Sequence, residues 1–206
     1  MSEPAMQSPL HAFGLPTLAK PADASAGVWA SEVPLLGYIG LRGGSDNPVF
    51  VEAASRALGL ALPTTACVSA QTDATIALWL SPDEWLIVCP RSELSRTLAD
   101  LRQSLAGIRS QVVDISGGYT KLVVQGRNAA DVMRNVSVYN FETLAEGRVV
   151  GTTFGKASAY ICREGQGFCL VIRRSFADYI WRYLVRAAEP YGFGVVRLPD
   201  TSRAAS

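Results

Sequence analysis

The sequence has few of the residue types that enzymes use for acid–base, nucleophilic or metal chemistry. Its only histidine is His11, so a Ser-His-Asp or Cys-His site would have to recruit that side chain from the first few residues. The cysteines show no metal-type spacing and do not resemble a disulfide framework; they are Cys67, Cys89, Cys162 and Cys169. We therefore expect no catalytic residue, no cofactor-binding residue and no metal ligand in this chain.

An excess of charge of one sign is missing as well. The chain has 19 Lys and Arg residues against 18 Asp and Glu residues, and no basic face or stripe, so nucleic-acid binding is not expected. No apolar run is long enough to cross a bilayer, and the first residues lack the basic and apolar regions of a secretory signal. We expect no membrane contact and a cytoplasmic location.

Hydrophobic residues, in contrast, are abundant and make up 49% of the chain. Such a content suggests apolar surface that is reserved for a partner. A compact core built from two sheets would explain much of the same excess, so both interpretations stay open.

Neither a P-loop nor a dinucleotide-binding fingerprint occurs, and the remaining polar motifs are weak. Two glycines in residues 42–48 precede a helix start and could cradle a phosphate, although a plain strand-to-helix turn explains them better. Asp83 and Glu84 are adjacent carboxylates in a turn, where we expect solvent. Residues 114–119 (DISGGY) form either a site or a joint that reverses the chain, because both uses favour such glycines.

The clearest structural signal is a β-hairpin over residues 74–90. Two apolar runs flank turn-forming residues at Ser81 to Glu84. With that turn, Leu80 lies opposite Trp85, and both faces of the hairpin are apolar. Other parts of the fold must therefore cover each face.

A second hairpin is expected over residues 156–173, because its turn follows the first one 83 residues later. Under the same shift the apolar positions of the two halves coincide, for example Ile39 with Leu122 and Leu101 with Leu184. We interpret this agreement as an internal duplication.

The second hairpin places Cys162 opposite Cys169, which leaves two alternatives. One is a cross-strand disulfide. The other is a pair of buried thiols in a reducing compartment, which we favour because free cysteine behaves as a small hydrophobic residue.

Each half is expected to form strand, helix, strand, strand, helix and strand, over about residues 36–115 and 119–197. The helix starts are marked by Asn47, Ser92, Asn128 and Ser175. The last helix is expected to bury Tyr179, Ile180, Tyr183, Leu184 and Ala187. The fold class is α+β: two tandem ferredoxin-like βαββαβ repeats packed as a pseudo-twofold unit, with helices on the outer faces.

Three regions are expected along the chain: an extended N-terminal arm (1–34), the duplicated domain (35–198) and a flexible tail (199–206). The arm is rich in Ala, Pro and Ser but carries scattered apolar residues, namely Leu10, Phe13, Leu15, Leu18 and Trp29. Simple disorder is one interpretation. The other is an extended segment that lies on this domain or on a neighbouring subunit.

Three motifs together resemble the gamma subunit of bacterial heterotetrameric sarcosine oxidase. They are residues 80–87 (LSPDEWLI), 113–120 (VDISGGYT) and 122–133 (LVVQGRNAADVM), and Ser8-Pro-Leu10 resembles the start of that family. The second and third motifs are more distantly similar to the folate-binding domain of the glycine-cleavage aminomethyltransferase, and the resemblance implies the same fold.

This resemblance implies a non-catalytic structural subunit of an alpha-beta-gamma-delta complex. Such complexes oxidatively demethylate sarcosine to glycine with hydrogen peroxide and, with tetrahydrofolate, methylene-tetrahydrofolate. The resemblance implies that FAD, FMN, NAD and zinc belong to the other subunits and that the large subunit is the main contact. The arm around Ser8 to Phe13 is then expected to touch it.

Two other functions remain open. The first is a stand-alone folate-binding one-carbon protein, although residues 155–160 (GKASAY) lack the cysteine of the related iron–sulphur assembly family. The second is an interaction module of another oxidoreductase. The identities of the neighbouring genes would distinguish these possibilities.

Overall fold

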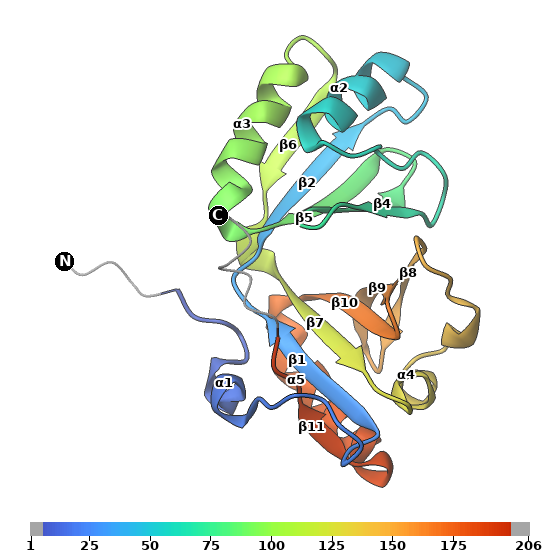
Figure 1. The fold of residues 1–206 in the computed structure, drawn as a ribbon. Coiled ribbons are helices and arrows are strands. Elements are labelled where there is room, and N and C mark those ends of the chain that lie inside the picture. Colours follow the sequence, from blue (N-terminus) through green and yellow to red (C-terminus); the bar gives the residue numbers. More distant parts are fainter. Residues whose placement is uncertain (1–5, 199–206) are drawn as a thin grey trace, which may run out of the picture.

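The computed structural model describes residues 6–198 and contains two β-sheets that face each other, with helices on their outer sides (Figure 1). The first sheet has the strand order β3-β4-β5-β2-β6, and the second has the order β11-β1-β7-β10-β9-β8. The predicted α+β class is therefore present. The predicted tail, 199–206, lies outside the described residues.

The first sheet and its helices come from one continuous stretch of chain. Its strands are β2 (Gly37–Gly43), β3 (Ser69–Gln71), β4 (Ile76–Ser81), β5 (Glu84–Cys89) and β6 (Ser110–Asp114). Helices α2 (Pro48–Leu58) and α3 (Leu94–Ser104) pack together on its outer face.

The second sheet combines segments from both ends of the chain. Its strands are β1 (Val28–Val33), β7 (Tyr119–Gln125), β8 (Val149–Phe154), β9 (Ala157–Glu164), β10 (Gly167–Arg173) and β11 (Phe193–Val195). Helices α4 (Ala129–Val136) and α5 (Ala177–Ala188) cover it, and the short helix α1 (Leu15–Leu18) lies nearby. Six single-turn 3₁₀ helices complete the described elements: η1 (His11–Phe13), η2 (Arg91–Glu93), η3 (Ser116–Gly118), η4 (Phe141–Thr143), η5 (Arg174–Phe176) and η6 (Glu189–Tyr191).

Helix α2 begins where the sequence predicts. The Asn47 side chain accepts hydrogen bonds from the backbone N–H groups of Val49 and Phe50, and Gly59 ends the helix with φ 65°. The predicted capping by Ser92 and Ser175 is wrong, because 3₁₀ turns η2 and η5 precede α3 and α5 and carry the chain into each helix.

The first hairpin has the predicted turn, but its register changes within β4. Ser81 pairs with Glu84, whereas Trp79, and not Leu80, pairs with Trp85. A bulge at Leu80 absorbs one residue, so the side chains of β4 before it point to the opposite face from the one predicted. The second hairpin follows the prediction without a shift, and Cys162 pairs with Cys169 as two free thiols.

The faces of the two sheets that lack helices pack against each other. They share one buried cluster, which includes Tyr38, Leu86 and Val88 from the first sheet and Cys169 and Val171 from the second. This agrees with the prediction that each half covers the other.

The two sheets are also joined along one edge. Val68, just before β3, bridges Arg148, just before β8. The Ser69 N–H donates to the Gly147 oxygen at 2.9 Å, and the Val149 N–H donates to the Cys67 oxygen at 3.0 Å. Backbone hydrogen bonds therefore connect the halves in addition to the apolar contact.

Strand β1 corrects the predicted domain boundary and the predicted second repeat. It lies between β7, to which it is antiparallel, and β11, to which it is parallel. Val28 and Ala30 have no exposed surface. The segment was predicted to be an arm because it is rich in Ala, Pro and Ser and shows no hydrophobic period, yet β1 occupies the place beside β7 that β6 occupies beside β2. The final strand β11 is displaced to the sheet edge.

Candidate partner-binding groove

The segment before β1 is docked on its own domain. Leu10 is 1% exposed and lies in the core of the second half, together with Leu15. Ser8 donates a hydrogen bond to the buried carboxylate of Glu32, which also accepts one from Thr120. Leu10 is therefore covered by this chain, as expected if the segment lies on its own domain, and it is not available to a partner. Contact of the remaining residues around Ser8 to Phe13 with a large subunit stays a prediction.

A groove of about 860 Å³ runs along the β11 edge of the second sheet. One wall is the segment from Phe13 to Lys20, and the other is α5. We call this the β11 groove; its lining residues are Phe13, Leu15, Leu18, Lys20, Ser25, Ala26, Trp29, Trp181, Arg182, Val185, Arg186, Glu189, Gly192, Phe193, Gly194 and Val195.

Aromatic side chains form much of the groove. The Trp181 ring lies 5.6 Å from that of Phe193, edge to face, and 6.2 Å from that of Phe13. Gly194 is required here, since a Cβ atom at this position would lie 2.4 Å from the Trp29 ring. Trp29 and Trp181 are only 2% and 3% exposed, so they support the floor of the groove, and the half-buried Phe13 and Phe193 provide its accessible aromatic surface.

The rim of the groove is mainly basic. Lys20, Arg182 and Arg186 line it, against a single acid, Glu189. Arg182 forms an ion pair of 3.0 Å with Asp178 and lies over the Phe13 ring. Arg186 has no ion pair within residues 6–198. The groove thus combines an apolar floor with positive charge that is only partly compensated.

Four of the sixteen residues that line the groove stand out in the sequence as apolar residues of the N-terminal segment. Phe13, Leu15, Leu18 and Trp29 were noted as apolar residues that a solvated arm would not need. The residues of α5 that line the groove were not noted in the sequence. Tyr179, which does not line the groove, was predicted to point inward but is 39% exposed; the buried stripe of α5 contains Ala177, Ile180, Trp181, Leu184 and Ala188. Trp181 is 3% exposed and points inward.

The glycines of residues 42–48 have a structural role. A Cβ atom on Gly43 would lie 2.3 Å from the Phe50 ring, which is completely buried. Gly43 therefore allows α2 to pack closely on the end of β2. This favours the strand-to-helix turn over a phosphate cradle.

The joint between the halves is held by local hydrogen bonds. The Asp114 carboxylate accepts from the backbone N–H of Ser116 at 2.9 Å and from its hydroxyl at 2.5 Å. Burial favours a higher pKa for Asp114, but these hydrogen bonds outweigh it, so the pKa is lowered. The Ser116 hydroxyl in turn accepts from the Tyr38 N–H at 3.0 Å. These contacts support the interpretation of residues 114–119 as a joint.

The other polar residues noted in the sequence lie at the surface. Asp83 and Glu84 both pair with Arg42, at 4.0 Å and 2.8 Å. Each of these side chains is at least 36% exposed, so the pairs add little stability. His11 is exposed in η1.

A buried polar cluster lies between the sheets. Lys121 is 7% exposed and pairs with Glu164 at 3.0 Å. Burial favours a lower pKa for Lys121, but the charge and hydrogen bond of the Glu164 carboxylate oppose it, and the pKa is raised. The hydrogen bond with Cys162, together with burial, raises the pKa of the Cys169 thiol, so both groups keep their protons at neutral pH.

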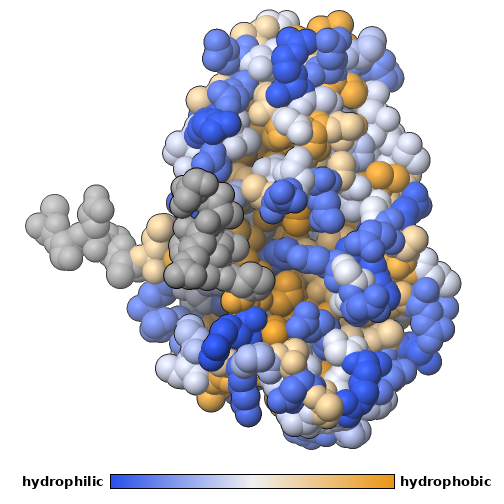
Figure 2. Space-filling view, in the orientation of Figure 1, coloured by the Kyte–Doolittle hydropathy of each residue, from blue (hydrophilic) through white to orange (hydrophobic). Residues whose placement is uncertain are grey.

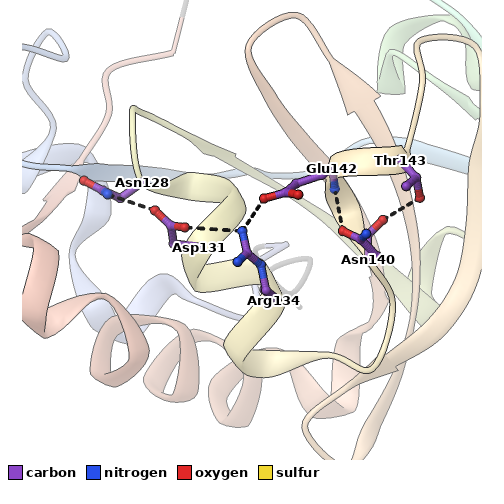
Figure 3. A network of polar contacts seen from close by, with 6 residues as sticks. All are labelled: Asn128, Asp131, Arg134, Asn140, Glu142 and Thr143. Atoms are coloured by element: carbon purple, nitrogen blue, oxygen red, sulfur yellow. Dashed lines mark hydrogen bonds and ion pairs between the residues drawn. The ribbon is translucent and has the colours of Figure 1, made fainter.

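A surface network organises the chain after α4 (Figure 3). Asn128 donates to Asp131, which pairs with Arg134, and Arg134 also pairs with Glu142. Asn140 then accepts from the Glu142 N–H. Asn128 is thus at the predicted helix start, but its side chain bonds to Asp131 and not to a backbone N–H group. The network connects α4 to η4.

Over the described part of the chain, no group of three His, Cys, Asp or Glu side chains is placed to hold a metal ion. None of the helices within residues 6–198 is long and apolar enough to cross a membrane. On the face shown in Figure 2, polar residues cover much of the surface and apolar atoms show near its middle.

Known proteins match this chain over most of its length. The sarcosine oxidase gamma subunit family matches residues 42–189. The gamma subunit of sarcosine oxidase from Arthrobacter sp. is 32% identical over 143 residues, which cover 68% of this chain and 70% of that protein.

Two solved structures share the fold. A chain of heterotetrameric sarcosine oxidase from Corynebacterium sp. U-96, in complex with pyrrole 2-carboxylate, superposes with a TM-score of 0.80 at 25% identity, covering 90% of this chain and 96% of that one. Aminomethyltransferase T of the glycine cleavage system from Bartonella henselae gives a TM-score of 0.65 at 17% identity, over 91% of this chain and 58% of that one. The chain belongs to the sarcosine oxidase gamma subunit family.

Proposed function

We propose that this chain is a non-catalytic structural subunit of a heterotetrameric sarcosine oxidase, which oxidatively demethylates sarcosine to glycine with hydrogen peroxide. The observation that carries this proposal is the match to almost the whole of one chain of a heterotetrameric sarcosine oxidase. The polar motifs support it, because the glycines before α2 and the acid of the joint both serve packing or local hydrogen bonds. The partners are the alpha, beta and delta subunits.

The cofactors of the complex, FAD, FMN, NAD and zinc, are assigned to the other subunits in this proposal. The isolated chain should be colourless and metal-free. Co-expression with the three partner chains should give a complex that forms peroxide only when sarcosine is added. Turnover by this chain alone, or stoichiometric flavin or zinc in it, would overturn the assignment.

A folate-binding one-carbon protein is the second candidate. It is favoured by the shared fold with aminomethyltransferase T, which at 17% identity concerns the fold alone. The tryptophans offer a direct test, because tetrahydrofolate bound near them would quench their fluorescence. Saturable quenching of the isolated chain would support this candidate, and quenching only in the assembled complex would support the subunit role.

A further inference from the structure

Strand β11 exposes one edge of the second sheet to the β11 groove. In a parallel ladder, alternate residues direct both backbone groups to the same neighbour. The Val28 N–H donates to the Gly192 oxygen, and the Val196 N–H donates to the Ala30 oxygen. Gly194 therefore faces β1, and the N–H groups of Phe193 and Val195 point to the outer side.

The outer side already accepts one residue in strand fashion. The Lys20 N–H donates to the Val195 oxygen at 3.1 Å, and the Lys20 oxygen accepts from the Arg197 N–H at 2.8 Å. This pairing stops at Lys20, since the preceding residues form α1. The Phe193 N–H, the Phe193 oxygen and the Val195 N–H are left along the floor of the groove.

Such an edge is a template for an added strand. The groove beside this edge determines which side chains an added strand can carry. Its charged residues are mainly basic, Lys20, Arg182 and Arg186 against Glu189, and its floor is aromatic. A matching segment is extended and carries acidic side chains, with an apolar side chain that reaches Trp181 and Phe193.

We propose that β11 binds an extended acidic segment of a partner subunit of the oxidase, which adds to the sheet as a seventh strand on the outer side of β11. This inference rests on the proposed function and names the surface through which the chain assembles. The charge complementarity distinguishes this occupant from a second copy of the chain, whose own β11 groove carries the same positive charge.

Single-amide hydrogen–deuterium exchange in the free chain and in the co-expressed complex tests the proposal. The Phe193 and Val195 amides should exchange at least about tenfold more slowly after assembly, because a new strand accepts from or covers them. The Gly194 amide is the internal control, since it already faces β1 and should be protected in both states. Unchanged exchange at Phe193 and Val195 in an intact complex would overturn the proposal.

A charge variant provides an independent measurement. Arg186→Glu should weaken association with the partner chains about tenfold at low salt, and less at high salt, because attraction becomes repulsion at an exposed rim. Arg102→Glu on α3 is the matched control, because Arg102 is also an exposed helical arginine without an ion pair among residues 6–198, but it lies in the first half. Equal affinity of both variants would count against the groove.

The two proposals fail in different ways. If the wild-type chain does not co-purify with the partner subunits, the subunit role is wrong and the groove proposal falls with it. If the wild-type chain assembles while the Phe193 and Val195 amides and the Arg186 variant remain unaffected, the subunit role stands and the groove is not its docking surface.

Discussion

Thr120 donates a hydrogen bond of 2.6 Å to Glu32 across the boundary between β7 and β1. Glu32 is 5% exposed, and its second oxygen accepts from Ser8. The Glu32 carboxylate thus connects β1, which was predicted to be part of an arm, to β7 and to the N-terminal residues. Without this pair of hydroxyl donors, a carboxylate in this position would be strongly unfavourable.

Glu32→Ala should lower the free energy of unfolding by about 1–3 kcal/mol, since the Thr120 and Ser8 hydroxyls lose their acceptor. Ser8→Ala should cost only about 0.5–1.5 kcal/mol, the usual range for one hydrogen bond at the margin of the core. Urea unfolding monitored by tryptophan fluorescence gives both values. A larger loss in Ser8→Ala than in Glu32→Ala would contradict this ranking.

Tyr38→Phe should preserve or increase stability at neutral pH, by up to about 1 kcal/mol. The Tyr38 hydroxyl is buried between the sheets and has no hydrogen-bond partner among residues 6–198, so its removal abolishes a desolvation cost. Urea midpoints at pH 7 measure the effect. A loss of more than about 1 kcal/mol would show that the hydroxyl has a partner.

The same substitution should change the alkaline response. Burial raises the pKa of Tyr38, so the folded chain keeps a proton that the unfolded chain releases near pH 10. The stability linked to this proton is complete below that pH and falls above it, by about 1.4 kcal/mol per pH unit. Tyr38→Phe should reduce this slope. Burial also raises the pKa of Tyr119 and Tyr160, so part of the slope should remain. If stability falls equally steeply with pH in the wild-type chain and in Tyr38→Phe, Tyr38 does not contribute to the alkaline loss of stability.

Trp85→Ala and Trp181→Ala should each cost roughly 3–5 kcal/mol, as expected for emptying a large buried site. Trp85 has no exposed surface, and its indole N–H donates to the Pro63 oxygen at 2.6 Å, so its loss should be the greater. Val138→Ala is the control, because Val138 is 89% exposed. A melting temperature of either tryptophan variant equal to that of Val138→Ala would contradict the burial of that tryptophan.

Deletion of residues 1–34 should prevent folding of the second half. It removes β1, whose loss leaves β7 and β11 without their shared neighbour, and it removes the buried Leu10. Deletion of residues 1–5 alone is the matched control and should leave the described core intact. Soluble chain with native far-UV circular dichroism after the longer deletion would show that β1 is dispensable.

Local signals in the sequence predicted much of the fold because the relevant contacts are close in the chain. Asn47 caps α2 through neighbouring N–H groups, and the Cys162–Cys169 register follows from a four-residue turn. Equivalent apolar residues, such as Leu101 and Leu184, lie on the buried faces of α3 and α5, the helices of their own halves. The internal duplication remains an interpretation of this pattern.

Long-range and irregular features could not be predicted in the same way. The bulge at Leu80 cannot be recognised in a run of apolar residues. It nevertheless places the side chains of the preceding part of β4 on the opposite face of the sheet. Strand β1 looks polar at Glu32 because its hydroxyl partners are 24 and 88 residues away. The β11 groove combines segments that are distant in the sequence. Only the apolar residues of its N-terminal wall were noticeable before the structure was known.

The placement of β1 between β7 and β11 has a consequence for synthesis on the ribosome. The first sheet uses residues 37–114 only, so it can form as soon as that stretch has emerged. Strand β1 is made before all of them but stays unpaired until β7 has been synthesised, and its other side stays unpaired until β11 has emerged. The second half is therefore expected to fold later and more slowly than the first, because β1 must pair with β11, which is distant in the sequence. During that interval the Val28–Val33 segment is the part of the nascent chain most in need of a chaperone.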